Sequence, residues 1–315
     1  SIRGPGRSTF SAVATGADTP TMASVPAISR DKTFVLGVGA QKAGTSWLHD
    51  HLASSPQCDP GFMKEYHVWD GLDLEAMSHF RDRLMKRAQR AAGQLARGEQ
   101  ATAENLRLAS FYADPDAYFD YFELLLSRLG IRATMDVTPS YAMLSAERLA
   151  AIRDGFERRG IRVAPVFLMR EPVERIWSAV RMYKQRRPER HDSTPEERVL
   201  EVYDAPWFEL RTRYEHTMDA LDSVFGPDGV HYALYERLFE ESSVEELSAF
   251  IGIDPVPADT GRRVNASPKS DLLRLPDGAA RRVAEHYRAT YEAVAERVGP
   301  DVVAAAWPDQ RWLRS

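Results

Sequence analysis

The chain has 315 residues, of which 43% are hydrophobic and 28% charged, enough to bury the core of one domain or two small ones. A net charge of −5 and a pI near 6.0 give no overall basic field, so we expect no binding to nucleic acid. Cys58 is the only cysteine, which excludes an intrachain disulfide framework and a cysteine-rich zinc site and favours a cytoplasmic location. No apolar run approaches the ~20 residues that span a bilayer, so we expect no membrane span.

The first 31 residues are rich in Ser, Thr, Ala, Gly and Pro and lack hydrophobic periodicity, which predicts a disordered tail. Met22 opens a stretch that reads as a native start, so residues 1–21 are interpreted as an added leader; an organellar targeting segment is the competing interpretation. From residue 32 to 315 there is no long linker or repeat. We therefore expect a single domain over 32–315.

Four short apolar runs have the pattern of buried parallel strands, which read as continuous hydrophobic stretches rather than alternating ones. They cover residues 34–38, 132–137, 163–169 and 231–234. Helical patterns lie between and after them, at 45–53, 74–95, 116–129, 146–159, 172–184, 207–224, 244–251 and 277–298. This alternation predicts an α/β fold in three layers, with a central parallel sheet flanked by helices. Ligands of such sheets bind beyond the carboxyl ends of the strands.

The loop from Gly39 to Ser46 follows the first predicted strand and opens a helix, which is the context of an anion-binding loop. An ATP-type phosphate loop has the pattern G-x-x-x-x-G-K-[ST]. Here Gly39 and Gly44 have that spacing, but Thr45 stands where the lysine belongs, and the lysine is inside the loop at position 42. A solvent-exposed strand-to-helix turn is the alternative interpretation. The displaced lysine weakens a kinase or ATPase interpretation.

Lys42, Gly44, Thr45, Ser46 and Trp47 together resemble the 5′-phosphosulfate loop of the sulfotransferase superfamily, whose fold is like that of the P-loop NTPases. The resemblance implies 3′-phosphoadenosine 5′-phosphosulfate as co-substrate. Lys42 would bridge its 5′-phosphate and sulfuryl oxygens, and the amides of residues 43 to 46, from Ala43 on, would hold the phosphate. Trp47 would lie near the adenine or pack in the core.

A second segment follows the third predicted strand. Arg170 and Ser178 are eight residues apart, with Pro172 at the start of a helix, so a charged fork and a hydroxyl can converge on one anion. The form R-x-P-V-E-R resembles the 3′-phosphate-binding motif of the same superfamily; a solvated helix start is the alternative. Later, Asn265 to Lys269 resembles a segment that closes over the donor in bacterial members, with Lys269, Arg262 or Arg263 as the contact.

The segment from Lys64 to Asp70 contains candidates for general base chemistry, for which a carboxylate near the acceptor hydroxyl is suited. It resembles the K-E-x-H-F-F-D stretch of the heparan sulfate branch. The resemblance implies that Glu65 is the catalytic base, that His67 orients or polarises, and that Asp70 supports them. A polar surface loop is the alternative, and no spacing completes a zinc site, so we expect no metal.

Asp136 to Tyr141 resembles an E-K-[ST]-P-x-Y element of that branch, but Val137 replaces a lysine that helps to bind acidic sugar chains, which argues against a polyanionic glycan acceptor. The sequence therefore favours O-sulfotransfer to a small-molecule, glycan or lipid hydroxyl, including a β-hydroxyacyl intermediate. Residues 71–114 and 184–206 are expected to shape the acceptor pocket. A nucleotide kinase or ATPase with a variant loop, and a protein that only binds the donor, are the competing hypotheses.

Overall fold

The computed structural model describes residues 29–100, 102–188, 193–257 and 274–313. Residues 1–28 of the tail predicted for 1–31, and the predicted contacts of Arg262, Arg263 and Lys269, lie outside these ranges. The prediction was wrong for residues 29–31, which begin the first strand of the sheet.

The centre of the molecule is a five-stranded parallel sheet with the order β2-β3-β1-β4-β5. Its strands are β1 (Ser29–Gly39), β2 (Cys58–Asp59), β3 (Ala133–Val137), β4 (Ile161–Met169) and β5 (His231–Leu234). The four predicted strands are confirmed. The two-residue strand β2 was not predicted, because it is too short to carry a hydrophobic pattern.

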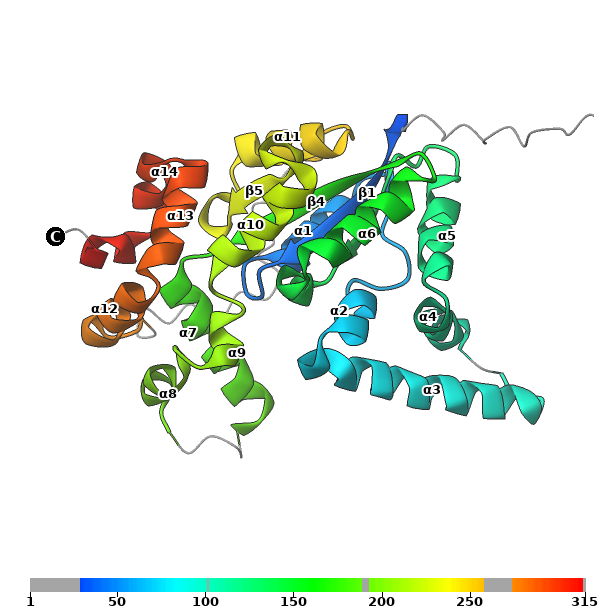
Figure 1. Cartoon of the computed structure of the whole chain (residues 1–315), viewed down its shortest axis with the longest axis horizontal. Coiled ribbons are helices and arrows are strands. Elements are labelled where there is room, and N and C mark those ends of the chain that lie inside the picture. Colours follow the sequence, from blue (N-terminus) through cyan, green and yellow to red (C-terminus); the bar gives the residue numbers. More distant parts are fainter. Residues whose placement is uncertain (1–28, 101, 189–192, 258–273, 314–315) are drawn as a thin grey trace, which may run out of the picture.

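Helices flank the sheet on both faces, as expected for a three-layer α/β fold (Figure 1). The chain crosses from β1 to β2 through α1 (Thr45–Ala53). It crosses from β3 to β4 through α6 (Ala146–Glu157), and this second crossover runs in the opposite direction across the sheet. Because such crossovers are right-handed, α1 and α6 lie on opposite faces. On the α6 face the ring of Phe34 stacks on Phe156 at 4.0 Å and meets Phe122 of α5 (Pro115–Leu126) edge-on at 4.8 Å.

The remaining helices lie around this layer. They are α2 (Val68–Asp73), α3 (Ser78–Ala96), α4 (Ala103–Ala113), α7 (Pro172–Arg186), α8 (Pro195–Val202), α9 (Pro206–Glu209), α10 (Tyr214–Phe225), α11 (Glu241–Ile251), α12 (Asp277–His286), α13 (Arg288–Val298) and α14 (Pro300–Ala306). Short 3₁₀ turns lie at η1 (Glu75–Met77), η2 (Pro139–Met143), η5 (Tyr235–Arg237) and η6 (Pro308–Leu313), among others. None of the described helices has the length and apolar character needed to cross a membrane.

Three predicted helices differ from the structure. The helix expected at 207–224 is two helices, α9 and α10, because the hydroxyl of Thr212 donates to the carbonyl of Phe208 at 2.6 Å and the chain turns there. The helix expected at 277–298 is also two, α12 and α13, joined at the buried Tyr287. The helix expected at 74–95 begins only at Ser78, after a 3₁₀ turn.

Candidate active site

The loop between β1 and α1 lies at the carboxyl edge of the sheet, where the fold is expected to bind a ligand. Gly44 has a φ of 90°, and a Cβ there would lie 2.7 Å from Leu238 Cδ1, so only glycine fits. Lys42 also has a left-handed φ, of 73°. Gly44 precedes the first turn of α1 and has no side chain to cap it, so the first amides of this helix remain available to an anion.

The predicted loop residues differ in their exposure. Ala43 and Thr45 are buried, Ser46 is half-buried, and Trp47 is 6% exposed. The Trp47 ring stacks on His51 with centroids 4.7 Å apart and meets Phe239 edge-on. The Trp47 ring therefore packs against the neighbouring turn of α1, and its contact with the donor stays a prediction.

Lys42 is surrounded by positive charge. Burial lowers the pKa of its ammonium, and the charges of Arg170, Arg186, Arg181 and Lys64 lower it further, in that order. Among the described residues, its Nζ makes a polar contact only with the sulfur of Met182, at 3.7 Å. We call these five cations, Lys42, Lys64, Arg170, Arg181 and Arg186, the cation cluster. Cations held together at a helix start form a site for an anion with several negative charges.

Arg170 lies at the end of β4, as predicted. Its guanidinium donates to the carbonyl of Lys42 at 3.4 Å and to Glu174 at 3.0 Å, and it lies over the ring of Tyr235. Its buried Nε has no hydrogen-bond partner among the described residues, and the same holds for Nε of Arg181. Buried donors without acceptors are the groups expected to bind a ligand oxygen.

Ser178, the partner predicted for Arg170, is buried on α7, 7% exposed. No direct contact joins it to Arg170 in the described residues. Arg181 and Arg186 follow on the same helix, and neither was singled out from the sequence. The sequence signal that could have identified them is their spacing, because they follow Ser178 by about one and two helical turns and so lie near the same face of the helix.

The structure brings together Glu65, the predicted base, and its two predicted helpers, His67 and Asp70. The Nε2 of His67 lies 3.2 Å from Glu65 Oε2, and its Nδ1 lies 2.7 Å from Asp70 Oδ2. The hydroxyl of Ser140 donates to the same Asp70 oxygen at 2.5 Å. The imidazole stacks on Phe80, with centroids 3.6 Å apart. A ring that faces a carboxylate at each nitrogen is stable when both nitrogens carry a proton.

The pKa values follow from these contacts. Burial alone would lower the pKa of His67, but the hydrogen bonds to Asp70 and Glu65 outweigh it and raise the pKa to about 9. Burial likewise would raise the pKa of Glu65, but the hydrogen bond to His67 and the charge of Lys64 lower it to about 2. At neutral pH Glu65 is therefore a carboxylate and His67 an imidazolium. We call Glu65, His67 and Asp70 the relay.

Lys64 connects the loop to this relay, a role that was not predicted for it. Its Nζ lies 2.7 Å from Glu65 Oε1 and 3.3 Å from Thr45 Oγ1 at the start of α1. The carbonyl of Lys64 accepts a hydrogen bond from the amide of Val137, which fastens the segment to the end of β3. One ammonium group thus touches both the anion-binding loop and the candidate base.

The Asp136 to Tyr141 element packs against the segment that carries Glu65 and His67 and accepts hydrogen bonds from its backbone. Asp136 is fully buried and accepts hydrogen bonds from Tyr118, Thr138 and Tyr141; burial raises its pKa to about 6. Val137 is also fully buried, and a Cβ on Gly37 would lie 2.8 Å from it. The side chain at position 137 therefore packs inside the sheet and does not face an acceptor.

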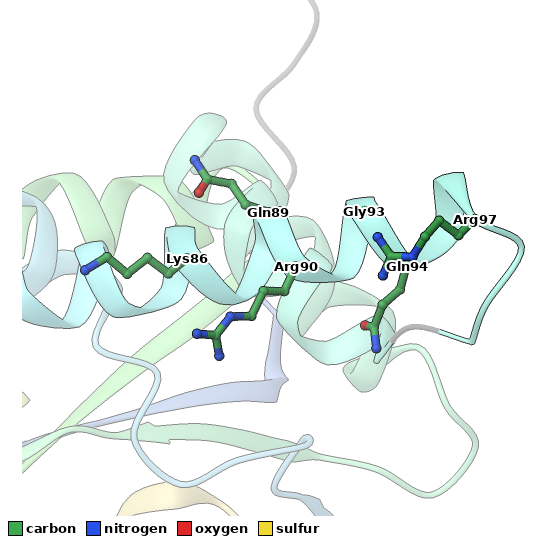
Figure 2. A pocket seen from close by; sticks show the side chains of 6 residues that line it. All are labelled: Lys86, Gln89, Arg90, Gly93, Gln94 and Arg97. Atoms are coloured by element: carbon green, nitrogen blue, oxygen red, sulfur yellow. The ribbon is translucent and has the colours of Figure 1, made fainter.

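A separate shallow hollow lies along α3, lined by Lys86, Gln89, Arg90, Gly93, Gln94 and Arg97 (Figure 2). Its lining residues come from α3 and from Arg97, which directly follows that helix, and none comes from a strand end. Within the described residues, no group of three or more His, Cys, Asp or Glu side chains could hold a metal ion. The polar groups that could take part in a reaction are therefore those around Lys42 and Glu65.

Comparison with known proteins identifies the fold. No family model matches the chain, and no curated protein does. Among solved structures, a sulfotransferase from Alicyclobacillus acidocaldarius aligns with a TM-score of 0.53 and 19% identity, over 85% of this chain and 96% of that one. The sulfotransferase domain from the curacin biosynthetic pathway aligns with a TM-score of 0.46 and 16% identity, over 84% of this chain and 99% of that domain. The first alignment shows that this chain has the P-loop-like sulfotransferase fold.

Proposed function

We propose that the protein is a sulfotransferase that moves a sulfuryl group from 3′-phosphoadenosine 5′-phosphosulfate to an acceptor hydroxyl. The observation that carries the proposal is the cation cluster at the start of α1, joined through Lys64 to a Glu–His–Asp relay. A donor with a 5′-phosphosulfate and a separate 3′-phosphate supplies the negative charges that five clustered cations require. The sulfotransferase fold supports the same conclusion.

The donor contacts follow from the loop and α7. Lys42 and the amides of Ala43, Gly44, Thr45 and Ser46 would hold the 5′-phosphosulfate at the helix start. Arg170 and Ser178 would hold the 3′-phosphate, and the unpartnered Nε of Arg181 suits a further phosphate oxygen. Trp47 and Lys269 remain proposed donor contacts.

The chemistry is an in-line displacement at sulfur. The acceptor oxygen forms a bond to sulfur while the bond from sulfur to the 5′-phosphate oxygen breaks, and the acceptor proton passes to Glu65. Lys42 and the loop amides stabilise the charge that collects on the departing phosphate, which is usually the largest contribution to group transfer. His67, protonated between two carboxylates, keeps the Glu65 carboxylate oriented.

A carboxylate with a pKa of about 2 is a weak base, and Lys64 is one cause of that value. A phosphosulfate at the loop attracts the Lys64 ammonium away from Glu65, because Lys64 already contacts Thr45 on the loop side. We infer that donor binding raises the basicity of Glu65.

The main competing function is a nucleotide kinase or ATPase. Such enzymes place Mg²⁺ at the hydroxyl that opens the helix. Here the Lys64 ammonium lies 3.3 Å from the Thr45 hydroxyl, and four other cations surround the loop, so a divalent cation would be repelled. A protein that only binds the donor is the other alternative, and the presence or absence of turnover separates it from an enzyme.

The test combines binding and turnover. Calorimetry without magnesium should detect tight binding of 3′,5′-adenosine bisphosphate, and labelled donor should deliver sulfate to at least one class of hydroxyl acceptor. Lys42→Ala should reduce the rate of sulfuryl transfer by about 100-fold or more without a change in melting temperature, whereas Lys86→Ala on α3 should behave as wild type. Binding of ATP that depends on magnesium, without binding of the bisphosphate, would refute the proposal.

A further inference from the structure

Two buried guanidinium groups lie outside the cation cluster. Arg175 of α7 is fully buried, and its Nε, Nη1 and Nη2 have no hydrogen-bond partner in the described ranges; the group lies over the ring of Phe208 at 5.6 Å. Arg211, in the turn between α9 and α10, is 6% exposed and stacks on Trp207, 3.1 Å from its centroid. It donates to the carbonyl of Trp207 at 3.3 Å and contacts the sulfur of Met77 at 3.7 Å.

No carboxylate of the described chain neutralises either group through a salt bridge. Asp70, the acid that acts on one of them electrostatically, is engaged by the protonated His67 at 2.7 Å. Glu209, at the end of α9, is engaged by Arg213 at 2.6 Å. Two buried positive charges without a counter-ion are unfavourable by several kcal/mol each, unless a ligand supplies the negative charge.

Arg211 lies beside η1, the turn that follows the base segment, through its contact with the sulfur of Met77. Burial lowers the pKa of Arg211 to about 10, and Tyr183, Arg175 and Asp70 are the neighbours that influence it electrostatically. The hydroxyl of Tyr183 lies 3.4 Å from Gln41 Oε1, beside the loop lysine. The residues around Arg211 therefore come both from the base segment and from α7. An acceptor whose hydroxyl reaches Glu65 while its other end extends toward α7 would meet this guanidinium.

We propose that the acceptor is a hydroxycarboxylate: a molecule with the reacting hydroxyl and a separate carboxylate, which binds Arg211 with Arg175 behind it. This inference rests on the proposed sulfotransferase function and names its acceptor class. The positive charge is carried by two enclosed guanidinium groups, those of Arg211 and Arg175, and not by an open basic surface. Such a site fits a single carboxylate and not a polyanionic chain. The aromatic rings of Trp207 and Phe208 suit an apolar body next to that carboxylate.

The experiment uses matched acceptor pairs that differ only in charge. Wild-type protein, labelled donor and a series of 3-hydroxycarboxylates and 4-hydroxyphenyl-substituted acids, each beside its carboxamide, would be assayed for kcat and KM. We expect the acids to exceed their amides in kcat/KM by about 10- to 100-fold, the value of a hydrogen bond to a charged group, mainly through KM. This comparison needs no variant.

Three variants locate the effect. Arg211→Gln should remove the preference for acids, and Arg211→Lys should restore part of it. Arg213→Gln, two residues away and paired with Glu209, should keep the wild-type preference. Affinity for 3′,5′-adenosine bisphosphate should be equal in all four proteins.

The outcomes separate this inference from the proposed function. A wild-type protein that binds the bisphosphate but prefers the amides, or sulfates none of the acids, overturns the acceptor assignment alone. An acid preference that survives Arg211→Gln overturns the assignment of that residue. A wild-type protein that does not bind the bisphosphate overturns the proposed function and, with it, this inference.

Discussion

Removing the carboxylate of Asp70 should change the charge of His67 at neutral pH. In wild type, two carboxylates overcome burial and raise the pKa of His67 from 6.5 to about 9. Asp70→Asn keeps the size of the side chain, and an amide oxygen can still accept from Ser140. It removes the larger of the two acidic contacts, so the pKa of His67 should fall.

The magnitude follows from linkage between protonation and folding. A histidine whose pKa is higher in the folded state contributes stability that is complete below pH 6.5 and is lost as the pH rises through 9. Each unit is worth ~1.4 kcal/mol, so His67 contributes about 3 kcal/mol at pH 6. The side chain is only 14% exposed, so solvent screening reduces this figure little.

Urea unfolding at pH 6 and pH 9.5 measures the effect, and NMR of labelled histidine measures the pKa directly. Burial raises the pKa of Glu171 to about 9, so ionisation of this group also destabilises the folded protein in an overlapping pH range. The quantity to compare is therefore the difference in unfolding free energy between wild type and Asp70→Asn. The difference in unfolding free energy should be larger at pH 6 than at pH 9.5. Asp50→Asn, which removes the more exposed contact to His49, is the control. A wild-type His67 pKa below 7 would refute the reasoning.

Three further changes test other parts of the site and the fold. Glu171→Gln should remove a stability loss that wild type shows as the pH rises from about 4.5 to about 9, because the raised folded-state pKa makes the carboxylate form unfavourable; urea unfolding across this range would detect it, and parallel curves would contradict it. Gly44→Ala should lower the melting temperature and weaken bisphosphate binding more than Gly98→Ala, since a Cβ meets Leu238 at the first and nothing within 4 Å at the second; equal losses would argue against the clash. Lys64→Met should raise the pKa of Glu65 in the free protein, seen as an upward shift of the acidic limb in the pH profile of kcat/KM for the donor, and an unmoved limb would exclude Lys64 as a cause.

The sheet could be predicted because its strands are buried on both faces and read as continuous apolar runs. The grouping of Glu65, His67 and Asp70 was expected from the resemblance of their segment to the heparan sulfate branch. Because the three are close in sequence, a single turn at the start of α2 is enough to bring them together, and their catalytic roles stay a prediction.

The features that were missed depend on contacts between distant segments. The break between α9 and α10 interrupts a helical pattern at Thr212 and turns Arg211 inward onto Trp207, which periodicity does not signal. The cation cluster joins Arg181 and Arg186 of α7 to a loop about 140 positions earlier in the chain, as the contact between Lys42 and Met182 illustrates. Such proximity follows from the crossover topology and not from spacing.

The contact of Lys64 with both Thr45 and Glu65 has a kinetic consequence. Under the proposed function, the ammonium neutralises the carboxylate before the nucleotide arrives, and an acceptor that enters first meets a weak base. We therefore expect a preferred order, in which the nucleotide enters first and its spent form leaves last. Product-inhibition patterns would record that order, with the bisphosphate competitive against the sulfate donor and noncompetitive against the acceptor.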